Sequence, residues 1–310
     1  MSKIVKEIVS IPFGQTRAII RSRMSRANLM ALAEQALQED MGSGDATACI
    51  FSDRKPRTAY FLARQDGVLS GSKIVEAVFY QLDPKARFKW FLNDGDSFTD
   101  NQPIADVTAP MATLLTGERT ALNFMQQLSG VATLTAAYVK ALEGTDIGVY
   151  DTRKTTPLLR ALEKQAVLDG RGDSHRFGLY DMAMLKNNHI DAAGGIEAAV
   201  EILRDNGFYK KRPRLALCIE ARDMTEAVAA LLVGADIIML DNMKPAEVRR
   251  VVARLAELAT KDHPLPAIEV SGGITLKNIR GYRDLPISRI SVGAITHSPP
   301  AVDISFRYKK

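Results

Sequence analysis

The chain has 310 residues, of which 46% are hydrophobic and 25% are charged, and its formal net charge is +5 at pH 7. A chain of this size buries a large core and lies near the length at which one core divides, so we expect two closely joined domains. No apolar run approaches the roughly 20 residues that span a bilayer, and the sequence has no secretion signal, so we expect a cytoplasmic protein that does not bind membranes.

The two cysteines and the basic residues narrow the function classes further. Cys49 and Cys218 lie far apart without the spacing of metal ligands, which predicts neither a disulfide framework nor a zinc site. The excess positive charge is compatible with nucleic acid, an anionic membrane or small polyanionic substrates. The basic residues near the N-terminus show no helical stripe and indicate a solvated arm, or alternatively a docking arm at a subunit interface: Lys3, Lys6, Arg17, Arg21, Arg23 and Arg26.

The first third of the chain has a mixed α and β pattern. Apolar residues recur at helical spacing from Asn28 to Asp40, and glycines follow as a stop signal. Alternating and aromatic-rich runs predict strands over 57–63, 87–92 and 103–109, with a helix over 72–82. A long helical region follows from Met111 to Glu143, and we expect a break near Ser129 and Gly130.

After Glu143, short apolar runs alternate with helical stretches, which is typical of βα units and a parallel sheet. The predicted strands end at Asp151, Lys186, Glu220, Asp241, Val270 and Gly293. The predicted helices cover 157–168, 194–206, 223–233, 245–259 and 275–281. A polar, charged or glycine-bearing cluster follows each strand, where α/β barrels place their active sites. This pattern favours a barrel over an open doubly wound sheet.

Basic side chains gather after two of these strands. In DTRKTTP, which covers 151–157, Arg153 offers a fork that matches a carboxylate or phosphate, and Lys154 offers a compact charge. An ordinary βα loop with a threonine cap is the alternative for this segment alone. His175, Arg176 and Lys186 should converge on the same barrel mouth. So much positive charge without matching acids implies an anionic ligand.

Acidic and glycine residues follow the other strands. Glu220 and Asp241 end consecutive strands and should face one mouth, where they could hold ribose hydroxyls, ligate Mg²⁺ directly or through water, or stabilise a developing positive charge. Paired carboxylates also serve glycoside hydrolysis, but the surrounding cations favour a phosphorylated substrate. The SGG of Ser271, Gly272 and Gly273, and the later Gly293, are similar to the backbone nests that bind phosphate.

Six segments together resemble one enzyme family, the quinolinate phosphoribosyltransferases. They are RTALNFMQQLSGVAT, DTRKTTP, SHRFGLYDMAMLKNNH, DNMKP, SGGIT and ISVGAITHS, and the resemblance runs from about Gly44 to Ser305. It implies an α/β fold in which an incomplete, seven-stranded α/β barrel at 123–293 joins an N-terminal α/β sandwich domain at 1–122, completed by about 294–310. It also implies a homodimer, or a multiple of dimers, with shared active sites.

The resemblance implies an activity and a role for each site residue. The enzyme would convert quinolinate and phosphoribosyl pyrophosphate to nicotinate mononucleotide, pyrophosphate and CO₂ in NAD biosynthesis, with Mg²⁺ as cofactor. The implied quinolinate ligands are Arg119, Arg153, His175, Arg176 and Lys186, with Arg64 donated by the partner subunit. The implied phosphoribosyl pyrophosphate and catalytic residues are Lys154, Glu220, Asp241, Ser271, Gly272, Gly273, Gly293 and His297, of which Glu220 and Asp241 would hold the metal.

The sequence departs from the family pattern at several positions. The family usually has GGGxNHR where this chain has GRGDSHR, which makes Arg171, Asp173 and Ser174 unusual. It usually has Asp, Glu and Gly where Asn187, Cys218 and Leu158 stand here. Two alternative functions remain open: a paralogous phosphoribosyltransferase that uses a different acid or base, and a non-catalytic protein that binds anions or nucleic acid. No nucleic-acid-reading motif is apparent, so we expect no nucleic-acid partner.

Overall fold

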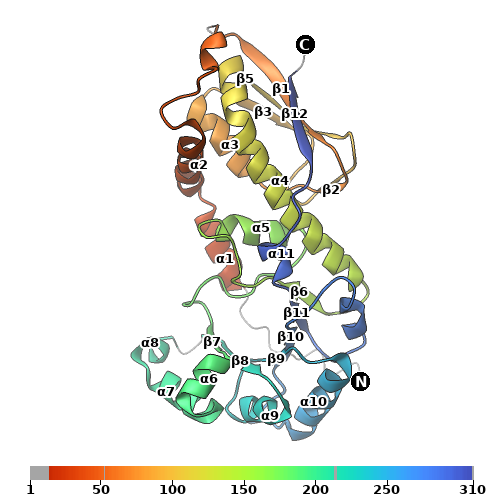
Figure 1. Cartoon of the computed structure of the whole chain (residues 1–310). Helices are drawn as coiled ribbons and strands as arrows, with labels where there is room; N and C mark the ends of the chain where they lie inside the picture. The colour runs from red at the N-terminus through yellow and green to blue at the C-terminus, as the bar shows by residue number, and fades with distance from the viewer. Residues whose placement is uncertain (1–13, 52, 213–214, 309–310) are drawn as a thin grey trace. The chain divides into compact units, whose positions relative to one another are not determined.

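The computed structural model describes residues 14–51, 53–212 and 215–308, which form two compact units (Figure 1). The first unit contains Tyr138–Arg153 and Asp173–Gly293, with the described residues up to Ala18. The second contains Ile19–Ala137, Lys154–Gly172 and the described residues from Ala294 onward. The expected domain boundaries, 1–122 and 123–293, stay a prediction, because compact units and family domains need not coincide.

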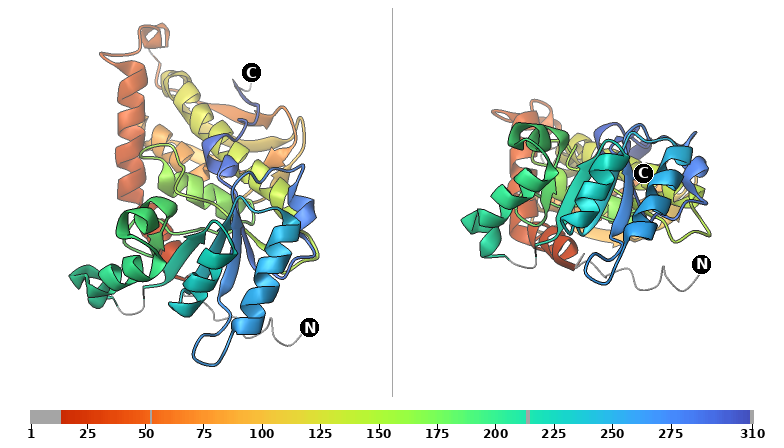
Figure 2. Two further views of the ribbon diagram at one scale, coloured as in Figure 1. Left: turned by 60° about the horizontal axis from the view of Figure 1, so that its bottom comes forward. Right: turned by 90° about the horizontal axis from the view of Figure 1, so that it is seen from below.

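A parallel sheet of six strands organises the first unit, in the order β6-β11-β10-β9-β8-β7 (Figures 1 and 2). The strands are β6 (Gly148–Tyr150), β7 (Ala183–Leu185), β8 (Leu217–Ala221), β9 (Ile237–Asp241), β10 (Ala267–Ser271) and β11 (Arg289–Ser291). The helices are α6 (Asn187–Ala193), α7 (Ile196–Asp205), α8 (Gly207–Lys210), α9 (Met224–Leu232) and α10 (Pro245–Leu258), with the 3₁₀ helix η3 (Ile279–Tyr282). The expected α/β class is therefore confirmed.

The family resemblance implies seven barrel strands, and beside the six named strands the described part of the chain adds one isolated bridge to this sheet. Asp173 pairs with Tyr150 in parallel, outside any named strand. The chain then turns toward the side chain of Asp151, whose Oδ1 accepts from the backbone N of His175 at 2.8 Å. This contact replaces the next bond of a strand ladder. The helix expected over 275–281 is wrong in type, since a single 3₁₀ turn occupies Ile279–Tyr282.

An antiparallel sheet organises the second unit, in the order β12-β1-β5-β3. Its strands are β1 (Pro56–Ala63), β3 (Arg87–Trp90), β5 (Pro103–Pro110) and β12 (Ile304–Tyr308), and β2 (Gly67–Val68) pairs with β4 (Ser97–Phe98). Aromatic rings join the sheet to α3 (Ser72–Leu82): the Phe61 ring lies 4.8 Å from that of Phe306 and 6.5 Å from that of Phe79 on α3. The C-terminal strand is thus an integral part of this core.

The other helices of the described chain include α2 (Arg26–Met41), the 3₁₀ helix η2 (Ala48–Ile50), α4 (Met111–Ala141), α5 (Arg160–Asp169) and α11 (Ala294–His297). The break that we expected in the long helix is wrong, because α4 is continuous through Ser129 and Gly130. A Cβ at Gly130 would lie 2.3 Å from the carbonyl oxygen of Pro300. The glycine therefore permits close approach of the 300–302 segment, whose Val302 donates to the Gln126 carbonyl at 3.0 Å.

The basic residues of the N-terminal arm that the structure describes, Arg17, Arg21, Arg23 and Arg26, are exposed as expected, but they lie on helices rather than in an irregular arm. Residues Gly14–Arg23 form α1, in which Ile20 is fully buried and Arg17 is paired with Asp173. Lys3 and Lys6 lie outside the described residues.

Among the helices that the structure describes, none is both long and apolar enough to cross a bilayer. The expected cytoplasmic location stays a prediction.

Candidate active site

The pleat of the parallel sheet places several predicted site residues on one face. The pairs Met184 with Cys218, Glu220 with Met239, and Asp241 with Ser271 are in register across neighbouring strands. Since side chains alternate between faces with a period of two, Lys186, Glu220, Asp241 and Ser271 share a face at the carboxyl ends of β7, β8, β9 and β10. The first unit therefore brings these four residues to one edge.

The next layer on this face is filled and mostly apolar. Met182, Cys218, Ile237, Met239 and Ala267 form one buried cluster. Burial raises the pKa of the Cys218 thiol, and the nearby Glu269 raises it further, so the thiol stays protonated and acts as a small apolar side chain. Of the two cysteines, Cys218 is thus a buried thiol, whereas Cys49 is exposed.

A buried ion pair continues this layer. Arg289 Nε lies 3.1 Å from Glu269 Oε2, and these side chains are 2% and 0% exposed. The Arg289 guanidinium lies 3.9 Å from the centre of the Tyr150 ring, and Ser291 donates to Glu269. Burial raises the pKa of Glu269, while the Arg289 charge and the Ser291 hydrogen bond oppose that rise.

Two arginines of the first unit, Arg153 and Arg176, influence each other through their charges. Arg176 is 5% exposed, and its Nη1 donates to the Met182 carbonyl at 3.1 Å. Burial lowers the pKa of Arg176, and the positive charge of Arg153 lowers it further. The Nε of Arg153 is buried without a hydrogen-bond partner among the described residues. Neighbouring cations with an unused buried donor are suited to an anion with two negative groups.

Asp151 fixes the segment that carries His175 and Arg176. Its Oδ2 accepts from the Ser174 hydroxyl at 2.7 Å, and its Oδ1 accepts from the His175 backbone N. The Nδ1 of His175 accepts from the Arg176 backbone N at 2.8 Å, which assigns the imidazole proton to Nε2. That nitrogen lies 3.6 Å from Glu269 Oε1. His175 is therefore 5% exposed, with its Nδ1 occupied by the Arg176 backbone N and its Nε2 toward Glu269.

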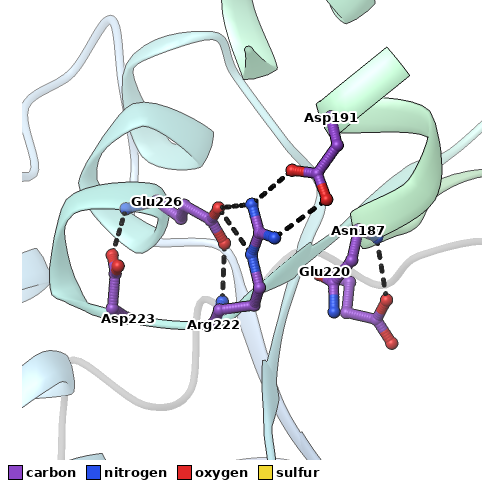
Figure 3. Close-up of polar contacts among 6 residues, drawn as sticks. All are labelled: Asn187, Asp191, Glu220, Arg222, Asp223 and Glu226. Atoms are coloured by element: carbon purple, nitrogen blue, oxygen red, sulfur yellow. Dashed lines mark hydrogen bonds and ion pairs between the residues drawn. The ribbon is translucent and has the colours of Figure 1, made fainter. Parts of the chain in front are cut away.

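Lys186 stands between the end of β7 and the start of α6. It is exposed, and its backbone N donates to Nδ1 of His189 at 3.0 Å. The next backbone N, that of Asn187, donates to Glu220 Oε2 at 3.1 Å, as Figure 3 shows. The lysine charge and the Glu220 carboxylate are thus held at adjacent strand ends.

The loop after β10 requires glycine at its two central positions. Gly272 and Gly273 both have positive φ, 91° and 62°. A Cβ at Gly272 would lie 2.3 Å from the Asn242 side-chain oxygen and 2.9 Å from its backbone N, so only glycine fits. The amide of Asn242 donates to Asp241 Oδ2 at 2.9 Å. Asp241 and the SGG loop are therefore coupled through Asn242, and Gly293 follows the neighbouring β11.

The remaining predicted residues belong to the second unit. The carbonyl of Lys154 accepts from the Thr296 hydroxyl on α11 at 2.8 Å, which brings Lys154 to the helix that ends at His297. Arg64 follows β1 and donates to the Asn101 side chain at 2.9 Å. Arg119 lies on α4, 62% exposed, with its Nη2 3.9 Å from Glu118. Neither of these two contacts involves another predicted site residue.

Two family models match nearly the whole chain. The model described as the N-terminal domain of quinolinate phosphoribosyl transferase matches residues 45–129, and that of the C-terminal domain matches 131–307. The chain belongs to the quinolinate phosphoribosyltransferase family.

Named relatives and solved structures agree with this family. The chain is 38% identical to the probable nicotinate-nucleotide pyrophosphorylase [carboxylating] of Bacillus subtilis, over 91% of this chain and 94% of that protein. It is also 38% identical to the human nicotinate-nucleotide pyrophosphorylase [carboxylating], over 90% and 91%. The crystal structure of NadC from Streptococcus pyogenes superposes with a TM-score of 0.84 at 36% identity, over 92% of this chain and 99% of that one.

The positions at which this chain departs from the quinolinate phosphoribosyltransferase pattern have local structural accounts. Leu158 and Arg171 stand where the pattern has glycine, and both adopt positive φ, 68° and 64°. A side chain in this conformation costs about 1–2 kcal/mol, so the fold imposes strain at both positions. Ser174 bonds to Asp151, and Asp173 pairs with Arg17. Asn187 replaces an acid next to Glu220, which avoids repulsion between two carboxylates.

Sequence reasoning missed the Glu269–Arg289 pair and the arginine at 222. Glu269 and Arg289 are single charges inside the otherwise apolar strands AIEVS and RIS. A charge inside a buried strand requires a partner, so this was the available signal. Arg222 directly follows β8, but nothing in the local sequence distinguishes it from a solvated loop residue.

Proposed function

We propose that this chain is a quinolinate phosphoribosyltransferase, which makes nicotinate mononucleotide, pyrophosphate and CO₂ from quinolinate and phosphoribosyl pyrophosphate in NAD biosynthesis. The observation that carries the proposal is that Lys186, Glu220 and Asp241 share one face at the strand ends of the unit that also contains Arg153 and Arg176. Cations for a dicarboxylate and carboxylates for a ribose thus occur together.

The site residues divide the reaction between them. Arg153, Arg176 and Lys186 bind the two carboxylates and orient the pyridine nitrogen toward the anomeric carbon. The bond from that carbon to pyrophosphate breaks as the bond to nitrogen forms, and Glu220 and Asp241 stabilise the transient positive charge on the ribose. The cationic ring then accepts the electron pair released with CO₂, and a proton takes the vacated carbon. The protein contributes binding, orientation and electrostatics.

The residues present fit the expected Mg²⁺ only together with substrate. Glu220 and Asp241 each accept one hydrogen bond, from Asn187 and Asn242. In the described part of the chain no group of three or more His, Cys, Asp or Glu side chains could hold a metal alone. Mg²⁺ is commonly held by one or two carboxylates with substrate phosphates and water, and it neutralises charge on a departing pyrophosphate. We therefore assign Glu220 and Asp241 as the protein's share of that site.

The proposal is tested by comparing quinolinate with nicotinate in the presence of phosphoribosyl pyrophosphate and Mg²⁺. A mono-acid leaves part of the cationic cluster unpaired, so kcat/KM for nicotinate should be lower by a factor of at least about 10. Mononucleotide and CO₂ are both measured, since only quinolinate releases CO₂. Equal use of the two acids would overturn the assignment. Turnover of a different acid or base in place of both would support a paralogous transferase.

We further propose that the enzyme is a homodimer with shared sites, in which Arg64 of one subunit serves the site that contains Lys154 of the other. The family resemblance motivates this assignment. In a symmetric dimer, Arg64→Ala and Lys154→Ala homodimers each have two damaged sites. A mixed dimer has one site with both lesions and one intact site.

Refolding or co-expressing the two variants together should therefore restore activity to about one quarter of wild type, because about half of the dimers are mixed and half of their sites are intact. Subunit exchange is verified with a tagged copy of one variant. Activity no greater than the mean of the separate variants, after exchange is verified, would show that Arg64 does not act across the dimer.

A further inference from the structure

The helix that begins after Lys186 is held at two points, by the end of β8 and by the first residue after it. At the first point, the backbone N of Asn187 donates to Glu220 Oε2 at 3.1 Å. At the second, Arg222 binds Asp191 through two hydrogen bonds, Nη1 to Oδ2 at 3.0 Å and Nη2 to Oδ1 at 2.7 Å (Figure 3). Residues 187 and 191 are one turn apart on the same face of α6, and 220 and 222 are two residues apart.

The guanidinium of Arg222 is itself fixed before it meets Asp191. Glu226 accepts from the Arg222 backbone N at 2.7 Å and from its Nε at 2.8 Å. Glu226 is held by the start of α9, where its backbone N donates to Asp223 Oδ1 at 2.9 Å. The guanidinium group is planar. Because Glu226 holds its Nε, the two Nη atoms face Asp191 in one orientation, and Arg222 binds Asp191 with little freedom.

Two contacts on one face fix both the position and the roll of a short helix. The buried side chain of Ile190 also holds α6, and the Arg222–Asp191 contact limits the remaining rotation of the helix about the Asn187–Glu220 bond, a rotation that would carry Lys186 with it. Displacements of about 1 Å at a binding group can cost a factor of up to about 10² in rate. The α6 anchor, defined here as Arg222, Asp191 and Glu226, therefore has its effect at Lys186 and Glu220, which the proposed function places in the site.

We propose that Arg222 is a positioning residue for quinolinate binding, acting through Asp191 on α6 to hold Lys186 in place. This inference rests on the proposed function for the role of Lys186. It does not require Arg222 to touch a substrate.

The variants Arg222→Ala, Arg222→Lys and Asp191→Asn test the α6 anchor. Arg222 and Asp191 have side-chain exposures of 41% and 55%, so the variants should fold, because exposed ion pairs contribute little to stability. We expect Arg222→Ala to raise KM for quinolinate by about tenfold, with kcat changed less than about threefold. Arg222→Lys keeps the positive charge but cannot make the two parallel hydrogen bonds to Asp191, so its KM for quinolinate should be raised as in Arg222→Ala.

Asp191→Asn separates positioning from simple electrostatics by the sign of its effect. If Asp191 affects quinolinate only through its charge, removing that negative charge should lower KM, because the substrate is an anion. If Asp191 instead acts through the α6 anchor, its loss should raise KM for quinolinate. The double variant Arg222→Ala/Asp191→Asn should be no worse than the more affected single variant, because both remove the same interaction. A lower KM for Asp191→Asn, or additive effects, would overturn the proposal.

Hydrogen exchange of the α6 amides gives a readout that does not depend on activity. Exchange at 187–193 should become faster in Arg222→Ala, but not in Arg254→Ala, which removes another exposed ion pair, that with Glu257 on α10. Faster exchange with unchanged KM would show a tether that does not position the substrate, and would overturn the proposal. Failure of the wild-type enzyme to use quinolinate would instead reject the proposed function and leave the exchange result standing.

Discussion

Replacing Arg153 or Lys186 with alanine is expected to lower kcat/KM for quinolinate by a factor of about 10² to 10³, the scale of losing one charged contact in a transition state. Arg153 has a buried Nε without a hydrogen-bond partner among the described residues, and Lys186 is exposed at the end of β7. The Arg153 Nε and the Lys186 side chain are therefore both available to bind an anionic ligand.

The stability of the Arg153 variant gives a second, independent outcome. Arg153 lies close enough to Arg176 to lower its pKa, so the two cations repel in the unliganded protein. Arg153→Ala should therefore lose activity without losing stability in urea unfolding, which is typical of residues kept for function. Lys210→Ala, which removes an exposed lysine paired with Asp205 on the same unit, is the matched control for Lys186→Ala. If both site variants fold and keep more than about half of wild-type kcat/KM, the strand ends are not the site.

The sequence predicted the features of the fold that depend on local patterns. Apolar runs followed by polar residues placed the ends of the strands near Lys186, Glu220 and Asp241 to within two residues of the structure. The period-two alternation of strands then put these residues on one face. This part of the site could be predicted because chain order and strand period determine it.

Features that depend on contacts between distant segments could not be predicted in this way. Glu269 meets Arg289 only because β10 and β11 are parallel neighbours in that register. Arg222 meets Asp191, 31 positions away, only because β7 and β8, which precede these two segments, are parallel neighbours. Gly130 suggested a helix break, but its role is to admit the 300–302 segment. A local signal is ambiguous when its physical cause is a non-local contact.

The buried Glu269–Arg289 pair should have the largest effect on stability. Glu269→Gln preserves the side-chain shape but leaves the Arg289 charge buried without its counter-charge, which costs about 3–5 kcal/mol in such pairs. The double variant Glu269→Gln/Arg289→Met should cost less than Glu269→Gln alone, because no unpaired charge remains. Urea unfolding with an unchanged m value measures both. As a control, Glu257→Gln in the exposed pair with Arg254 should cost less than about 1 kcal/mol.

The pH dependence of the Arg289→Met variant distinguishes an ion pair from simple packing. Burial already raises the pKa of Glu269, and Arg289 is the main influence that opposes this rise. Without Arg289, the folded-state pKa of Glu269 should lie still further above its unfolded value, which is about 4.3. The stability associated with the protonated carboxyl is complete below the unfolded pKa and is lost as the pH rises through the folded pKa. As the pH rises above the unfolded value, the free energy of unfolding of Arg289→Met should therefore fall more steeply than that of Glu269→Gln/Arg289→Met, which differs from it only in lacking that carboxyl. Parallel slopes for the two variants would contradict the prediction, because they would show that burial does not raise the pKa of Glu269 when Arg289 is absent.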